Sequence, residues 1–243
     1  MNFFKFAKLG RTLFLLTAVL ALGIIGCGGD DDDSEPDNGA VDPKTVVKGT
    51  FIDGRDGTEY KTVTIGKQTW MAENLNYWTN SGSWCYENRQ DNCEKYGKLY
   101  NWDAANKTCP KGWHLPSSDE WQILNRAITY VGDYSSSVAL KSKSGWNDWC
   151  GYSGNDSCTN GNGTNDYGFS ALPGGHWENG FYQTGEIGYW WLTTGFITMW
   201  YNSNFVYLDD NNTISLDNDG NRILFDISEY SSYGFSVRCL KDA

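Results

Sequence analysis

The sequence predicts an α+β fold of small twisted antiparallel sheets, with about two helices and long loops pinned by disulfides. Three observations support this prediction. Helix signals are scarce, short apolar runs alternate with clusters of Gly, Asn, Asp and Ser, and six of the seven cysteines lie in the body of the chain. Apolar runs bounded by such clusters are typical of strands joined by turns. Because 16% of the 243 residues are aromatic, the chain has the apolar surface to form a core, which excludes an intrinsically disordered protein.

The first 26 residues have the pattern of a secretory signal peptide. Three basic residues precede an apolar run over residues 13–25, and this segment contains no acidic residue. The run spans about a dozen residues, whereas a membrane-spanning helix needs about 20. It ends at Gly26-Cys27, which resembles the cleavage site of a bacterial lipoprotein and predicts acylation of Cys27. The alternative is an ordinary signal peptide that leaves Cys27 as a free thiol, but lipidation also explains the odd number of cysteines.

Residues 27–44 are predicted to form an acidic, flexible tether. Asp30–Asp33 are followed by Glu35 and Asp37, and such dense like charges repel one another and stay hydrated. An acidic run after a lipidated cysteine also resembles the surface-export signal of some Gram-negative lipoproteins. The sequence therefore predicts an outer membrane lipoprotein, with display at the cell surface as one outcome and a spacer without a sorting role as the other.

A single domain is predicted over residues 45–243, joined to the membrane only through the lipid anchor. The formal net charge of the whole chain is −11. Nucleic acid is excluded as a partner, because phosphate binding needs a basic face.

Six cysteines remain beyond Cys27, and these allow fifteen disulfide connectivities. They are Cys85, Cys93, Cys109, Cys150, Cys158 and Cys239. The spacing favours Cys85–Cys93 and Cys150–Cys158, because each pair is eight residues apart and is separated by polar turn-forming residues. Cys109–Cys239 is then left as a long-range bridge. An oxidising envelope favours disulfides over metal thiolates, and the absence of Cys-x-x-Cys spacing excludes a zinc cage.

The clearest helix is predicted to begin at a capping box formed by Ser117 and Glu120. In a capping box, the side chain of each residue accepts a hydrogen bond from the backbone amide of the other. The apolar residues that follow share one helical face, and a glycine ends the pattern: Trp121, Leu124, Ile128, Val131 and then Gly132. A weaker helix is predicted over residues 100–106.

Short strands are predicted over residues 62–65, 188–193, 205–208, 221–227 and 235–240. Residues 143–167 are rich in Gly, Asn, Asp and Ser and form a predicted long loop, which the Cys150–Cys158 disulfide pins.

Four ordered motifs carry a family resemblance. They are Trp-Met-Ala-Glu-Asn-Leu-Asn-Tyr at 70–77, Cys-Pro-Lys-Gly-Trp-His-Leu-Pro at 109–116, Tyr-Gly-Phe-Ser-Ala-Leu-Pro-Gly-Gly at 167–175 and Phe-Ser-Val-Arg-Cys at 235–239. The set resembles the Fibrobacter succinogenes major paralogous domain, and the resemblance covers about residues 50–241. That resemblance implies an exported and often lipid-anchored bacterial protein, but it implies no defined activity.

A more distant resemblance concerns the fold. The Trp-His-Leu-Pro segment at 113–116, followed by Glu120-Trp121, is similar to a helix start in the formylglycine-generating and sulfatase-modifying proteins. Those proteins elaborate the C-type lectin fold, so the resemblance implies a C-type-lectin-like domain with its termini drawn together. Their activity depends on a copper-binding cysteine pair that this sequence does not supply at matching positions, so the fold resemblance implies no shared activity.

A calcium site is one hypothesis from the lectin resemblance. Asn147 and Asp148 lie in a Trp-Asn-Asp-Trp-Cys stretch that resembles the calcium-binding segment of C-type lectins, with one residue fewer before the cysteine. Calcium takes six to eight oxygen ligands, so further carboxylates would have to come from Asp156, Asp166 or Glu178. A chance match is the alternative, and the sequence indicates no other cofactor.

Aromatic side chains on loops are the main ligand-binding candidates, because their rings can stack on the apolar faces of sugars. These candidates are Trp146, Trp149, Trp177, Tyr182 and Trp200, whereas Trp113, Trp121, Trp190 and Trp191 are expected in the core. His176, after two glycines, is the better functional histidine, and His114 is expected to be a hydrogen-bonded packing residue.

These observations favour a non-catalytic, lipid-anchored ligand-binding protein whose partner is a polysaccharide or another surface protein. No catalytic residues are predicted, because spacing identifies no nucleophile and base. The alternatives are an enzyme, of a hydrolase or sulfatase-modifying type, and a passive structural protein of the envelope.

Overall fold

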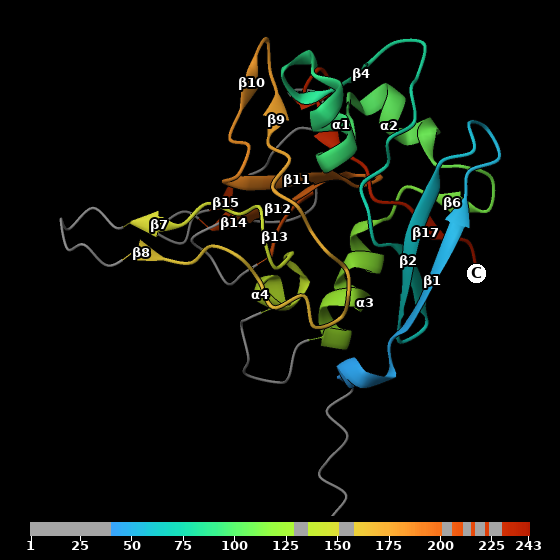
Figure 1. Ribbon diagram of the computed structural model, residues 1–243, viewed down its shortest axis with the longest axis vertical. Coiled ribbons are helices and arrows are strands. Elements are labelled where there is room, and N and C mark those ends of the chain that lie inside the picture. The colour runs from blue at the N-terminus through green and yellow to red at the C-terminus, as the bar shows by residue number, and fades with distance from the viewer. Residues whose placement is uncertain are drawn as a thin grey trace, which may run out of the picture. The chain divides into compact units, whose positions relative to one another are not determined.

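The computed structural model describes residues 40–128, 136–150, 158–200, 206–210, 215–216, 222–223 and 230–243. Two larger sheets and three two-stranded sheets make up the strand content of this part (Figure 1). The α+β prediction is therefore confirmed, with the sheets small and mostly antiparallel.

The first sheet has five strands and contains both ends of the domain. Its order is β1 (Val47–Ile52), β2 (Glu59–Ile65), β3 (Gln68–Met71), β17 (Leu240–Lys241) and β6 (Trp113–His114). All four pairings are antiparallel, and Leu240 lies between Trp70 and His114. The last strand of the chain is thus enclosed within the sheet, which fixes the C-terminal segment.

The second sheet has six strands in the order β13 (Val206–Asp210), β12 (Gly195–Trp200), β11 (Ile187–Trp191), β16 (Phe235–Ser236), β5 (Leu99–Tyr100) and β4 (Ser83–Trp84). One pairing, β11 with β16, is parallel, which departs from the predicted antiparallel arrangement. The three two-stranded sheets are β9 (His176–Trp177) with β10 (Phe181–Tyr182), β7 (Trp149–Cys150) with β8 (Cys158–Thr159), and β14 (Ser215–Leu216) with β15 (Arg222–Ile223).

The described part of the chain contains four α-helices and two short 3-10 helices. They are α1 (Gln90–Tyr96), α2 (Trp102–Thr108), α3 (Ser118–Ile128) and α4 (Ser136–Leu140), with η1 (Pro43–Thr45) and η2 (Tyr86–Asn88). The capping box is confirmed, because the amide of Ser117 donates to Glu120 Oε2 and the amide of Glu120 donates to Ser117 Oγ. The predicted helix over 100–106 is confirmed as α2, two residues later, whereas the prediction of about two helices missed α1 and α4.

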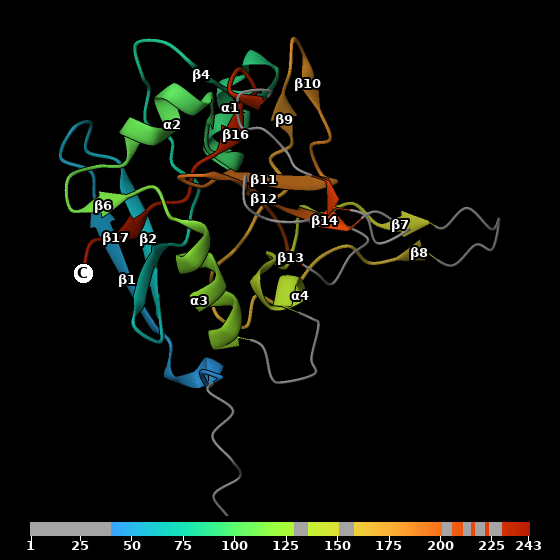
Figure 2. The same cartoon turned by 180° about the vertical axis from the view of Figure 1, so that it is seen from behind.

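Two cores lie on opposite faces of β11 and β12, as the alternation of side chains along a strand requires. Trp190, Ile197 and Met199 pack with the apolar face of α3, and Trp191 and Phe196 pack with Phe235 and the residues around α2. In both views, α3 and α4 lie on one side of this sheet, with α1 and the β9–β10 hairpin on the other (Figures 1 and 2). The prediction that Trp113, Trp121, Trp190 and Trp191 are core residues is confirmed, since each is buried.

All three predicted disulfides are present: Cys85–Cys93, Cys109–Cys239 and Cys150–Cys158. The long-range bridge joins the end of α2 to the segment between β16 and β17. In the loop-entropy view, closing its 130-residue separation stabilises the fold more than either local bridge does.

Some strand predictions need correction. Residues 235–240 form two strands in different sheets, β16 and β17, because the chain passes from one sheet to the other at Val237–Cys239. Most of the predicted strand at 221–227, together with Val131 and Gly132, lies outside the described residues. Within the segment assigned to the tether, Val41 already contacts the domain, since its amide donates to the carbonyl of Ala127.

None of the helices in the described ranges is both long and apolar enough to span a membrane.

Candidate functional site

The β9–β10 hairpin brings together three of the residues that the sequence singled out. His176 lies among aromatic rings, with centroid distances of 5.5 Å to Tyr182 and 5.0 Å to Tyr189. Trp177 stacks on Trp84 at 4.5 Å and 9°, so one face of its ring is covered. The side of this hairpin that carries Tyr182 is open to solvent, since Tyr182 is 49% exposed.

The chemistry of His176 is that of a neutral, partly buried ring. Burial lowers its pKa, and the charge of Glu178, whose Oε2 lies 4.0 Å from Nε2, only partly offsets this effect. Its Nδ1 is buried and has no hydrogen-bond partner in the described part of the chain. No described hydroxyl or thiol hydrogen-bonds to the ring, so the geometry supplies no nucleophile–base pair at this histidine.

Among the aromatic loop candidates near residue 146, the structure describes the side chain of Trp146. The expectation that Trp146 is exposed is wrong: the side chain is 4% exposed and its indole N–H donates to the carbonyl of Ala171. The side chains of Trp149 and Trp200 lie outside the described part of the structure. Flanking Asn and Asp residues favour exposure in general, but here the Trp146 ring belongs to a buried core cluster, and its backbone amide donates to Asn162 Oδ1.

The calcium hypothesis gains no ligand set from the geometry. Asn147 and Asp148 are exposed, and the described ranges contain no group of three or more His, Cys, Asp or Glu side chains that could hold a metal ion. Asp166 instead accepts a hydrogen bond from Thr164, and Asp156 lies outside the described residues.

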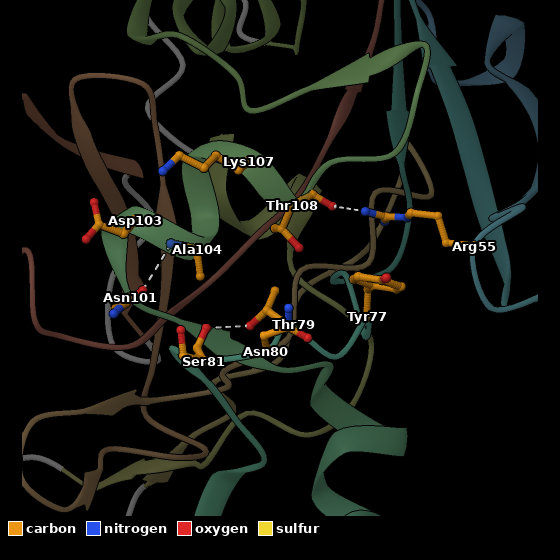
Figure 3. Close-up of a pocket in the computed structure, with 10 residues that line it drawn as sticks. All are labelled: Arg55, Tyr77, Thr79, Asn80, Ser81, Asn101, Asp103, Ala104, Lys107 and Thr108. Atoms are coloured by element: carbon orange, nitrogen blue, oxygen red, sulfur yellow. Dashed lines mark hydrogen bonds between the residues drawn. The ribbon is translucent and has the colours of Figure 1, made fainter.

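A polar cavity of about 340 Å³ lies elsewhere on the domain and was not predicted (Figure 3). Its walls come from three segments that are far apart in sequence: the β1–β2 turn, the loop between β3 and β4, and α2. The lining residues are Arg55, Tyr77, Thr79, Asn80, Ser81, Asn101, Asp103, Ala104, Lys107 and Thr108. Amide, hydroxyl and charged groups predominate, which suits a polar ligand with many hydrogen-bonding groups.

Arg55 is held at one end of this cavity by a buried carboxylate. Asp53 is fully buried, accepts the backbone amide of Arg55, and receives Nε at 2.9 Å and Nη2 at 2.6 Å. The Nη1 group donates to the carbonyl of Thr108 at 2.8 Å, and the guanidinium lies 3.8 Å from the centre of the Tyr77 ring. These contacts join the β1–β2 turn to α2 and the Tyr77 loop.

Asp53 and Arg55 each stabilise the charged form of the other. Burial disfavours the charged form of both groups, yet the mutual hydrogen bonds and opposite charges outweigh it. The pKa of Asp53 is lowered and that of Arg55 is raised as a result. Both groups are therefore charged at neutral pH.

The α2 side of the cavity begins at a helix cap. The side-chain Oδ1 of Asn101 accepts a hydrogen bond from the backbone amide of Ala104 at 3.0 Å. The backbone amide of Asn101 donates to the carbonyl of Gly82. A Cβ at residue 82 would lie 2.3 Å from Asn101 Oδ1, and φ is +75° there, so only glycine lets the 77–82 loop approach the helix this closely.

The floor of the cavity contains a polar group without a partner. Thr108 is 2% exposed, and its hydroxyl makes no hydrogen bond in the described part of the chain. Figure 3 shows this hydroxyl on the side of Thr108 that faces the Thr79–Asn80 loop. An unpaired buried hydroxyl costs stability.

A family model for the Fibrobacter succinogenes major domain matches residues 63–241. The chain belongs to the Fibrobacter succinogenes major domain family. No curated protein and no solved structure matches the chain.

The family segment contains most of the cavity but not all of it. The Tyr77 loop and α2 lie within the matched residues, whereas Asp53 and Arg55 precede them. One end of the cavity in this member of the Fibrobacter succinogenes major domain family is thus contributed by β1 and its turn.

A second charged cluster lies at the start of α3, within the Trp-His-Leu-Pro motif. His114 Nδ1 is 2.7 Å from Asp242 Oδ1, and Nε2 is 2.9 Å from Glu120 Oε1. Both contacts are favourable only when both ring nitrogens carry protons. Burial alone would lower the pKa of His114, but the two carboxylates outweigh it and raise the pKa. The histidine therefore joins the capping box of α3 to the C-terminus, as a packing residue.

This cluster predicts a pH-dependent contribution to stability. Because the folded-state pKa of His114 is raised above its unfolded value, the contribution is complete below about pH 6.5 and is lost as the pH rises through the folded pKa. The group is more than a third exposed, so solvent screening limits the effect to less than about 1 kcal/mol.

Urea unfolding of the wild type and of His114→Gln, measured from pH 5 to 9, checks this expectation. The difference in unfolding free energy between the two proteins should shrink as the pH rises, while other titrating groups, including His176, cancel in the difference. A difference that stays constant or grows with pH contradicts the assignment.

Proposed function

We propose that this chain is a lipid-anchored envelope protein whose domain binds polysaccharide, without catalysis, in the polar cavity between the Tyr77 loop and α2. The single observation that carries this proposal is the cavity itself, in which fixed backbone segments present free polar side chains to solvent. Asn80 is exposed, and its side chain makes no hydrogen bond within the described residues. Lys107 likewise forms no ion pair with any described carboxylate.

The chemistry of the cavity favours a sugar over an apolar ligand. Small-molecule sites are commonly about 300–1,000 Å³ and mainly apolar, and this cavity lies at the small, polar end of that range. Sugar hydroxyls both donate and accept, so a wall of amides, hydroxyls and charged groups can satisfy them. A surface protein as ligand is an alternative outcome of the test.

The scaffold also supports a binding role. The Cys109–Cys239 disulfide at the end of α2 and the N-cap of that helix hold one wall of the cavity before any ligand arrives, so little ordering entropy is lost there on binding. We further propose that the domain is a variant of the C-type lectin fold, because its first and last strands share one sheet and the Cys109–Cys239 bridge ties the chain end to its middle.

An enzyme of the sulfatase-modifying type would use free cysteine thiols, and the six cysteines in the described part of the chain all form disulfides. A hydrolase remains distinguishable by experiment, since it would release shorter products from a polysaccharide that it binds.

The proposed site predicts that two surface substitutions weaken sugar binding without affecting the fold. Asn80→Ala and Lys107→Ala remove exposed lining groups, so the unfolding midpoint should stay unchanged while affinity falls about three- to thirtyfold, the size expected for one lost hydrogen bond. Isothermal titration of the mature domain against plant and bacterial polysaccharides that bind the wild type measures this loss.

Lys111→Ala is the matched control for Lys107→Ala, since Lys111 is exposed and does not line the cavity. The proposal is wrong if the wild type binds none of the polysaccharides tested. It is also wrong if Lys107→Ala and Lys111→Ala lower the affinity equally. Product analysis by chromatography separates binding from hydrolysis.

The anchor part of the proposal predicts that Cys27 carries acyl chains. In a bacterial host, the wild type should fractionate with membranes and incorporate an alkyne-labelled fatty acid, whereas Cys27→Ala should do neither. A wild-type protein with an unlabelled Cys27 thiol would contradict acylation. Protease treatment of intact cells then reports whether the domain faces the outside.

A further inference from the structure

We propose that the cavity selects a sugar that bears a carboxylate, a uronic acid, which Arg55 binds through its two unused N–H groups. This inference rests on the proposed polysaccharide site and narrows its ligand class. A carboxylate bound to a guanidinium through two parallel hydrogen bonds is stronger and more directional than a hydroxyl at the same position.

The hydrogen bonds of Arg55 leave two of its N–H groups without a partner in the described part of the chain. A guanidinium has five N–H groups, and here Asp53 receives one from Nε and one from Nη2, while the carbonyl of Thr108 receives one from Nη1. One N–H on Nη1 and one on Nη2 have no partner in the described part of the chain. A carboxylate bridges Nη1 and Nη2 through the N–H groups on the edge that these two nitrogens share, and the side chain is 29% exposed, so a ligand can reach it.

The position of Arg55 is fixed before binding. The salt bridge to buried Asp53 and the stacking on Tyr77 hold the guanidinium plane, so the free N–H groups keep one direction. Surface arginines lose side-chain entropy when they bind a carboxylate, and this one has already lost it. Arg89 shows the contrasting case, because it forms the same kind of pair with Asp91 but is exposed and does not line this cavity.

The two ends of the cavity differ in chemistry, which gives a ligand one orientation. Figure 3 shows Arg55 at one end and Asp103 at the other, with Asn80 and Ser81 between them along the loop. A uronic acid unit fits this arrangement with its carboxylate at Arg55 and its hydroxyls toward the amides and Asp103. The net charge of −11 opposes long-range attraction of a polyanion, so affinity has to come from these contacts.

Matched ligands test the inference on the unmodified domain. Trigalacturonic acid, its methyl ester and the neutral galactose trisaccharide differ mainly at the carboxylate. We expect the acid to bind at least about tenfold more tightly than either of the other two. Equal or tighter binding of the ester or of the neutral sugar overturns the inference, while leaving the polysaccharide site itself supported.

Variants and a spectroscopic readout identify the residue. Arg55→Lys keeps the charge but loses the two-nitrogen geometry, so it should abolish the preference for the acid over the ester; Arg89→Lys is the matched control and should preserve it. The unfolding midpoint of each variant is measured first, because Asp53 loses partners in Arg55→Lys. If that variant does not fold, NMR of the arginine N–H resonances of the wild type is the deciding measurement. A shift of the Arg55 resonances on adding trigalacturonic acid supports the inference, and the absence of a shift contradicts it.

Two further outcomes separate this inference from the proposed function. If an acidic peptide competes with trigalacturonic acid at equal concentration, the site recognises carboxylates without recognising sugar, and the inference is wrong. If neither these trisaccharides nor any other polysaccharide binds, the proposed function fails together with it.

Discussion

The described structure depends on a buried arginine that is held by an asparagine. Arg238 is 1% exposed and donates through Nε and Nη2 to Asn74 Oδ1, at 3.1 and 2.7 Å, and through Nη1 to the carbonyl of Phe169. Asn74 Oδ1 also accepts the indole N–H of Trp190 at 2.8 Å, and its amide donates to the carbonyl of Tyr96. This one interaction therefore joins the end of β3, the strand β11, the helix α1 and the 167–175 segment.

Burying the charge of Arg238 costs free energy, and its hydrogen bonds favour one arrangement of the segments around it. Burial lowers the pKa of Arg238 to about 9, so the side chain remains charged at neutral pH although no described carboxylate lies within ion-pair distance. Removing a hydrogen-bond acceptor of such a buried charge costs at least about 1–3 kcal/mol. The same region positions the cavity: the amide of Leu75 donates to the carbonyl of Val237, and the Tyr100 hydroxyl donates to that of Tyr77 at 2.7 Å. The Tyr77 loop is thus a direct continuation of the backbone that this interaction fixes.

Sequence patterns predicted the features that depend on residues close together in the chain. The capping box at Ser117 and Glu120 and the two short disulfide loops depend on residues close in sequence, so they could be predicted, and the long disulfide then followed by elimination. The cavity could not, because Arg55, Asn80 and Lys107 meet only after three distant segments pack together. The division of residues 235–240 between two sheets depends on which strand each half pairs with, and the burial of Trp146 depends on the Ala171 carbonyl, a partner 25 residues away.

A double-mutant cycle between Asn74 and Arg238 tests this account most directly. Asn74→Ala, Arg238→Met and the double variant are unfolded in urea with the disulfides intact, and the free energies of unfolding are compared with the wild type. Each single substitution leaves the other partner's buried polar groups unsatisfied, so the double variant should be less destabilised than the sum of the singles by at least about 1 kcal/mol. Effects that add to within about 0.5 kcal/mol would show that the two residues act independently, and would contradict the central role given to their interaction.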